Sequence, residues 1–115
     1  MTYAEMLDKI QSAGAWFVGS FMGEFLVRHN DYNIDSASRV AFINYIHEEY
    51  GKNLDYSFDS TKTKCYALMS IINGGRVMDA LEHVINCNEK KVPEDAIHNA
   101  MELIDAIVKG KISLP

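Results

Sequence analysis

The first thirty residues of the chain constrain its fold more than any other part of the sequence. Met1–Asn30 is a long run of helix-forming residues in which apolar side chains recur at helical spacing. A single helix of this length would extend about 40 Å at 1.5 Å per residue, whereas a domain of this size has a radius of gyration of about 13 Å. We therefore predict a long, glycine-containing N-terminal helix that either bends or extends beyond its own core.

Three glycines lie within this segment, at positions 14, 19 and 23. A glycine inside a helix costs about 1 kcal/mol relative to alanine and usually marks a bend or the close approach of another backbone. Gly19, Ser20 and Gly23 form a stripe of small residues opposite a wide apolar face. This stripe fits either close packing within the chain or a seam between two copies of it.

Four further helices are predicted from apolar periodicity and from the residues that start and end helices. They cover residues 37–50, 61–73, 76–87 and 93–109. Gly51 and the pair Gly74–Gly75 end two of them, and Pro93 suits the first position of the last. No alternation typical of strands is present. The sequence predicts an all-α fold with one domain over residues 1–115, built as a compact bundle of about five helices.

The composition fits an ordinary globular protein and disfavours several classes of partner. Hydrophobic residues make up 48% of the chain and charged residues 23%, which is typical of folded domains and not of disordered ones. A net charge of −5 disfavours nucleic acid, because neutralising phosphates needs clustered Lys and Arg. No stretch resembles a signal peptide or a membrane span. We expect a cytoplasmic protein that binds neither nucleic acid nor membrane.

The residues that could carry chemistry match no catalytic or metal-binding pattern. The four histidines lack HxxxH spacing, and no GxSxG motif is present. His47 falls on the buried side of its helix, where one hydrogen bond would satisfy it. Cys65 lies on an apolar stripe and is expected to behave as a small hydrophobic residue, while its pairing with Cys87 is left open. We predict a non-enzymatic protein without catalytic residues, metal or cofactor.

One helix start has a composition that could attract an anion. The segment Asp59–Lys64 places hydroxyl groups and two lysines at the predicted start of the helix over 61–73, where backbone N–H groups and the helix dipole favour negative charge. Asp and Ser are also ordinary helix caps. The pattern therefore supports an alternative function, an oligomeric protein that binds or sequesters a nucleotide-like anion. The residues assigned to it are Ser60, Thr61, Lys62, Lys64 and Arg76.

The chain carries more aromatic surface than five short helices readily bury. Excess contiguous apolar surface tends to mark an interaction site. The main prediction is a small binding protein of the inhibitor, immunity or regulatory type, bacterial or phage, that acts through a helical protein–protein interface. We expect it to bind another protein, itself or both, as a homodimer or higher oligomer with the N-terminal helix near the seam. The residues assigned to this interface are Trp16, Gly19, Gly23, Phe42 and Tyr45.

Overall fold

The computed structural model describes residues 1–87 and 92–115, and every regular element in these residues is helical. The predicted all-α class is confirmed, and the radius of gyration is 13.3 Å. The described residues form seven α-helices, more than the five predicted, together with one π-helical turn. In chain order the elements are α1 (Tyr3–Ala13), α2 (Ala15–Val27), α3 (His29–Tyr32), α4 (Ser36–Ile46), η1 (His47–Gly51, the π-helical turn), α5 (Phe58–Asn73), α6 (Val77–Ile85) and α7 (Glu94–Val108).

The N-terminal segment is not one long helix as predicted, because it breaks at Gly14. This residue has a φ of +87°, in the left-handed region that residues other than glycine rarely adopt. Gly14 therefore ends α1 and begins α2, so the predicted bend falls at the first of the three glycines. A second break at Arg28 separates α2 from the short α3. Gly19 and Gly23 remain inside α2.

The predicted capping box of α1 is confirmed, but the starts of α5 and α7 differ from the prediction. Pro93 is the N-cap of α7 and not its first residue. Thr2 and Glu5 form the predicted capping box, with N–H to oxygen distances of 2.9 and 3.1 Å. By contrast, α5 begins at Phe58, three residues earlier than predicted. Its cap is Ser57, whose hydroxyl accepts a hydrogen bond from the Ser60 N–H at 3.1 Å. The hydroxyl and lysine residues proposed as an anion site thus lie inside α5.

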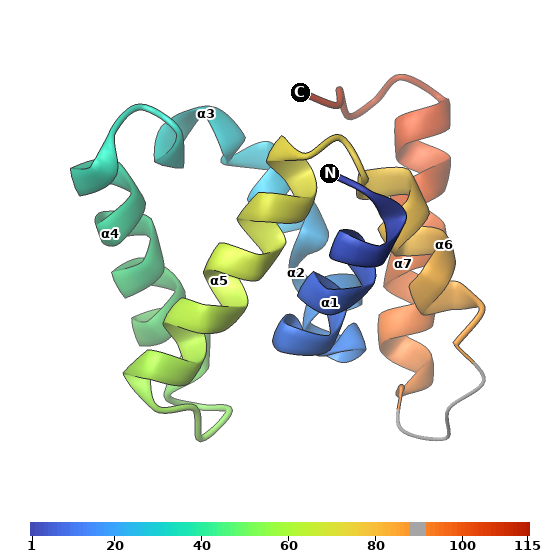
Figure 1. Cartoon of the computed structure of the whole chain (residues 1–115). Coiled ribbons are helices and arrows are strands. Elements are labelled where there is room, and N and C mark those ends of the chain that lie inside the picture. The colour runs from blue at the N-terminus through green and yellow to red at the C-terminus, as the bar shows by residue number, and fades with distance from the viewer. Residues whose placement is uncertain (88–91) are drawn as a thin grey trace.

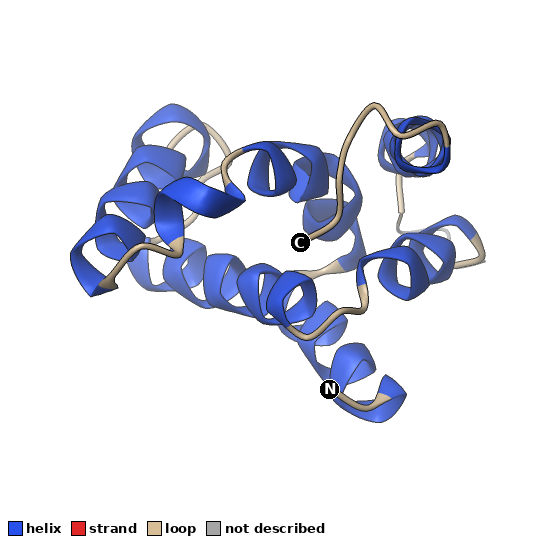
Figure 2. Cartoon of the chain, turned by 90° about the horizontal axis from the view of Figure 1, so that it is seen from above, coloured by secondary structure: helices blue, strands red, loops and turns tan. Residues whose placement is uncertain are grey.

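The central element of the molecule is α2. In Figure 1, α4 lies at one side of the molecule and α7 at the other, with α2 between them. Figure 2 shows from above that α1, near the N-terminus, and α7 lie on opposite sides of the molecule. α1 packs on α5, and α7 packs on both α2 and α6. No helix among the described residues has the length and apolar content needed to cross a lipid bilayer.

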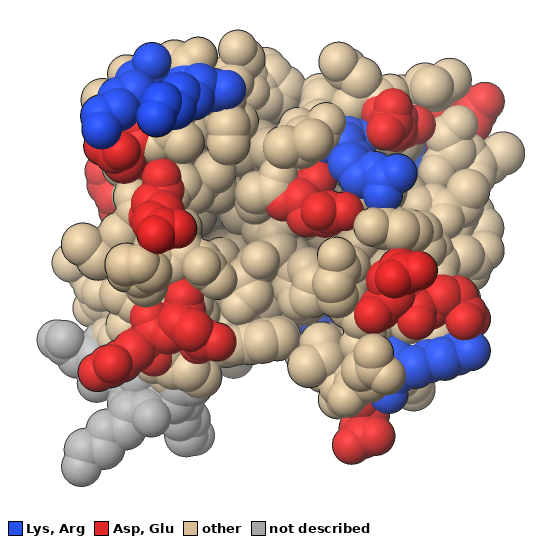
Figure 3. All heavy atoms as spheres, turned by 180° about the vertical axis from the view of Figure 1, so that it is seen from behind, with Lys and Arg blue, Asp and Glu red and all other residues tan. Residues whose placement is uncertain are grey.

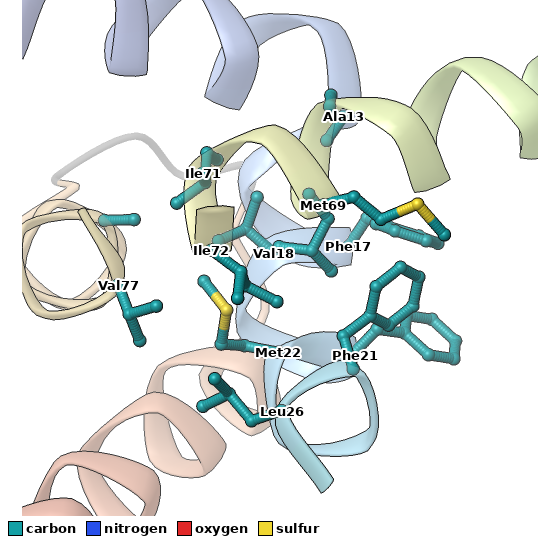
Figure 4. Close-up of a cluster of buried hydrophobic side chains, with 14 of the residues drawn as sticks. Ala13, Phe17, Val18, Phe21, Met22, Leu26, Met69, Ile71, Ile72 and Val77 are labelled. Atoms are coloured by element: carbon teal, nitrogen blue, oxygen red, sulfur yellow. The ribbon is translucent and has the colours of Figure 1, made fainter. Parts of the chain in front are cut away.

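The core forms where α2 meets α5, as Figure 4 shows. Close packing of these side chains removes apolar surface from water and supplies most of the stability. The side chains labelled there are Ala13, Phe17, Val18, Phe21, Met22, Leu26, Met69, Ile71, Ile72 and Val77, and all of them are buried.

The buried face of α4 includes Phe42, whereas Val40 on the same helix is 48% exposed. The reason is the short helix α3, which places Tyr32 in the core. The Phe42 ring packs on both Phe25 and Tyr32, with centroid distances of 4.9 Å to each. These aromatic contacts turn α4 so that Phe42 points inward.

Candidate protein-binding surface

A tyrosine and an arginine, each partly buried, meet between α2 and α4. The Tyr45 hydroxyl donates a hydrogen bond to the Glu24 carboxylate at 3.2 Å. The central carbon of the Arg28 guanidinium lies 4.4 Å from the centroid of the Tyr45 ring, where a cation is attracted by the π face. Arg28 also lies 3.7 Å from Glu24 and 3.8 Å from Asp31. We call these four residues the Tyr45 cluster.

The Tyr45 cluster is ordered by its own contacts. Partial burial, together with the neighbouring Glu24 carboxylate, raises the pKa of the Tyr45 hydroxyl. The hydroxyl therefore keeps its proton at neutral pH and remains a donor to Glu24. Because Tyr45 and Arg28 are held by partners within the chain, a molecule that binds them would remove little of their conformational freedom.

A groove of about 370 Å³ opens beside the Tyr45 cluster. Its inner side is formed by Phe42, which belongs to the core and packs on Phe25, so this part of the groove is firmly supported. The residues that line the groove are Arg28, Asp31, Ser38, Ala41, Phe42 and Tyr45.

A second groove, of about 410 Å³, lies on the other side of α2, between α2 and α7. Gly19 and Gly23 both line it. A Cβ at position 19 would lie only 2.8 Å from the Ala96 carbonyl oxygen, whereas a Cβ at position 23 would meet only the Leu103 side chain at 3.9 Å. Gly19 therefore allows close packing of α7 within the chain. A seam between copies along this stripe stays a prediction.

The five predicted interface residues lie on α2 and α4. Phe42 and Tyr45 meet at the first groove, and Gly19 and Gly23 line the second. Trp16 is half-buried, and its ring packs edge-on against Phe21 at a centroid distance of 5.9 Å. Four of the five predicted residues therefore lie at two grooves on different sides of α2, and Trp16 lies at neither. The role of all five in binding stays a prediction.

Two of the predicted anion-binding residues have partners within the chain. The Lys64 ammonium donates to the Ala13 carbonyl at 3.0 Å, and so caps the last turn of α1. The Arg76 guanidinium donates to the Met1 carbonyl at 3.1 Å and pairs with Asp79 at 2.7 Å. Lys64 thus binds the end of α1, and Arg76 binds both the N-terminal residue and the first turn of α6. Lys62 is exposed on α5.

A third predicted anion-binding residue, Thr61, is fully buried against the π-helical turn η1. Its hydroxyl lies 2.8 Å from His47 Nδ1, the hydrogen bond expected for this histidine, which is half-buried and not fully buried as predicted. A Cβ at Gly51 would lie 2.6 Å from both of these atoms, so glycine is needed where the turn closes. The Ser60 N–H is taken by Ser57. These contacts within the chain disfavour a nucleotide-like anion at this helix start.

The sequence interpretation missed the charged half of the Tyr45 cluster. Glu24 and Arg28 stand four residues apart on α2, a spacing that places two side chains on the same face of a helix, and this signal was available. Their meeting with Tyr45 depends on the packing of α4 beside α2 and has no signature in the sequence.

The cysteine, histidine and acidic side chains of the described residues do not form a second candidate site. Both cysteines are free thiols, and Cys65 is buried as expected while Cys87 is half-buried. Burial raises the pKa of the Cys65 thiol to about 12. Within residues 1–87 and 92–115, no three His, Cys, Asp or Glu side chains are grouped so that they could hold a metal ion.

Comparisons of the chain with protein-family models, with curated proteins and with solved structures find no match. Function is therefore inferred from the chain's own residues. Among the described residues, the Tyr45 cluster and its groove combine ordered aromatic and charged side chains with access to solvent.

Proposed function

We propose that this chain is a small non-enzymatic binding protein that holds another protein at the Tyr45 cluster. The observation that carries the proposal is the pairing of Tyr45 with Arg28 at the edge of an open groove. Tyrosine and arginine are enriched among the few residues that supply most of the binding energy in protein interfaces. Here both are held in one arrangement before any partner arrives, which lowers the entropic cost of binding.

The partner surface that fits this groove is basic. Asp31 lines the groove and Glu24 lies beside it, so two carboxylates face the single positive charge of Arg28. The chain as a whole carries a charge of −5. Figure 3 shows that acidic side chains are spread over the face of the molecule seen from behind, with basic ones in separate groups. Opposite charge on a partner would speed association and select its orientation. A helix or loop rich in Lys and Arg has this chemistry.

The proposed role is regulatory or inhibitory. A rigid groove on a small helical scaffold can cover a functional surface of a partner without any chemistry of its own. Its binding would weaken as salt is added, because exposed charges are screened within about 8 Å at physiological ionic strength.

Capture from the native host with three forms of the chain tests the proposal. Wild type and Tyr66→Ala, which changes an exposed tyrosine on α5, should retain the same protein in stoichiometric amount. Tyr45→Ala should lose it, and with the purified partner its Kd should rise about thirtyfold, as expected for the loss of about 2 kcal/mol at a central anchor. Retention of the same proteins by all three forms, or of none by any of them, would contradict the proposal.

A further inference from the structure

α7 has a second apolar stripe that the described residues leave partly exposed to solvent. Its inner stripe is buried against the rest of the molecule and consists of Ala96, Ala100 and Leu103. On the outer stripe Met101 is 54% exposed and Val108 is 72% exposed, while Ile97 and Ile104 are half-buried. The outer stripe therefore consists of Ile97, Met101, Ile104 and Val108.

The spacing of the outer stripe is that of a helix-pairing seam. Its members are separated by four, three and four residues, which is the alternation of apolar positions in a coiled coil. The stripe is also symmetric about its own midpoint. Ile97 and Val108 lie equally far from that midpoint, and Met101 and Ile104 lie equally close to it. Such a stripe can face a second copy of itself across a two-fold axis, with the same patch used on both sides.

The charges at the two ends of α7 select the antiparallel orientation. Glu94 and Asp95 begin the helix, and Lys109 and Lys111 follow its last turn. Figure 3 shows a basic group at the end of the molecule where α7 finishes, with acidic side chains toward the other end. Two antiparallel copies would bring the acidic end of one helix to the basic end of the other, whereas parallel copies would bring like charges together.

The existing ion pair of Lys109 does not prevent this arrangement. Its ammonium lies 2.9 Å from the Asp105 carboxylate, and both side chains are well exposed. Exposed pairs of this kind contribute about 0–1 kcal/mol, so Lys109 can turn toward a carboxylate on another copy at little cost.

We propose that a second copy of this chain docks antiparallel on the outer stripe of α7 and forms a two-fold symmetric dimer. The seam is then α7 and not the N-terminal helix. The contact is independent of the Tyr45 cluster, which lies between α2 and α4. One pair of helices buries less area than a permanent dimer requires, so the dimer dissociates on dilution.

Sedimentation of matched glutamate variants over a range of concentrations tests the surface. Val108 and Ile34 are both 72% exposed, but only Val108 belongs to the outer stripe. Wild type and Ile34→Glu should pass from monomer to dimer as concentration rises. Val108→Glu should raise the dimer Kd about tenfold or more, because it places a carboxylate against an apolar stripe and near the acidic helix start of the other copy. Proteins that stay monomeric throughout, or a Val108→Glu dimer as stable as the wild-type one, would overturn the proposal.

Cysteine cross-linking tests the orientation in a Cys87→Ser background. Ile97 and Val108 are separated by about 16 Å along α7 at 1.5 Å per residue, whereas a disulfide needs Cα atoms within about 7 Å. Oxidation of mixed Ile97→Cys and Val108→Cys chains should link one chain of each kind. Ile97→Cys alone should remain unlinked. Self-linked Ile97→Cys dimers would show a parallel pair and contradict the antiparallel assignment.

Discussion

The helices α2 and α7 are both apolar over more than one face, yet the fold covers them differently. On α2, seven residues are buried, on sides that face α5, α6 and α7. On α7, three residues are buried, and the outer stripe that contains Met101 and Val108 stays in contact with solvent. One helix is central, and the other lies at the edge of the molecule (Figure 1).

The difference shows that the width of a helix's apolar face does not predict whether other helices of the same chain cover it. α2 is covered because three other helices pack around it, and its glycines allow close approach. α7 packs on α2 and α6, and nothing else in the described part of the chain covers its outer stripe. An apolar stripe left open at an edge, with pairing spacing and complementary ends, is the signature of an assembly surface.

The largest contrast should appear when one apolar side chain is truncated on each helix. Phe25→Ala on α2 removes a fully buried ring and should lower the free energy of unfolding by about 3–5 kcal/mol. Met101→Ala on α7 should change it by less than about 0.5 kcal/mol in the monomer. Urea denaturation of dilute samples measures both. Equal losses would mean that the outer stripe is packed within the chain.

The next largest effect is expected when the two glycines of α2 are replaced. Gly19→Ala should destabilise the protein by about 1–3 kcal/mol, because the new methyl group would press on the Ala96 carbonyl at 2.8 Å. Gly23→Ala meets only the Leu103 side chain at 3.9 Å and should gain up to about 1 kcal/mol from helix propensity. Thermal melting separates the two outcomes, and a loss of similar size at both positions would refute close packing at Gly19.

The buried Cys65 thiol on α5 should make the free energy of unfolding depend on pH, with a smaller effect than the substitutions above. Burial raises the pKa of Cys65 to about 12, against about 8.5 in an unfolded chain. Between these values the unfolded chain loses the proton and the folded chain keeps it, so stability should fall as the pH rises from about 9 toward 12.

Denaturation at several alkaline pH values measures this loss. Cys65→Ala should flatten the dependence. Burial also raises the pKa of Tyr32, so part of the alkaline loss should persist in Cys65→Ala. An unchanged slope in that variant would contradict the assignment to Cys65.

The smallest effect is expected for a polar residue on the outer stripe. Met101→Gln should alter the free energy of unfolding by less than about 0.5 kcal/mol while it weakens association of two copies. Denaturation at low concentration and sedimentation at high concentration measure the two quantities separately. A large loss of stability in the dilute sample would show that this face belongs to the core.

The local signals in the sequence predicted the helical class and many of the helix ends. The capping box at Thr2 and the break at Gly74–Gly75 depend on residues within a few positions, and each is seen in the structure. The predicted end at Gly51 differs, because α4 ends at Ile46 and Gly51 lies inside the π-helical turn η1. Gly14 could not be singled out from the other two glycines. Its left-handed conformation is stabilised by Lys64, which reaches across from α5 to the Ala13 carbonyl.

The candidate site was predictable only in its separate parts. Phe42 and Tyr45 were chosen as aromatic surface on one helix, and Glu24 and Arg28 stand at helix-pair spacing on another. Their assembly depends on the rotation of α4, which follows from the packing of Tyr32 on Phe42. The apolar residues of α7 were likewise visible in the sequence, but which of its stripes is buried depends on where α7 lies in the fold.

Methyl NMR spectra recorded at increasing protein concentration test most directly whether α7 is the face that seats a second copy. The methyl signals of Met101 and Val108 should shift as the dimer forms, while those of Val27, an exposed residue on α2, should stay in place. Shifts at Val27 with unchanged signals from Met101 and Val108 would place the seam on the N-terminal half of the chain and contradict the proposed dimer.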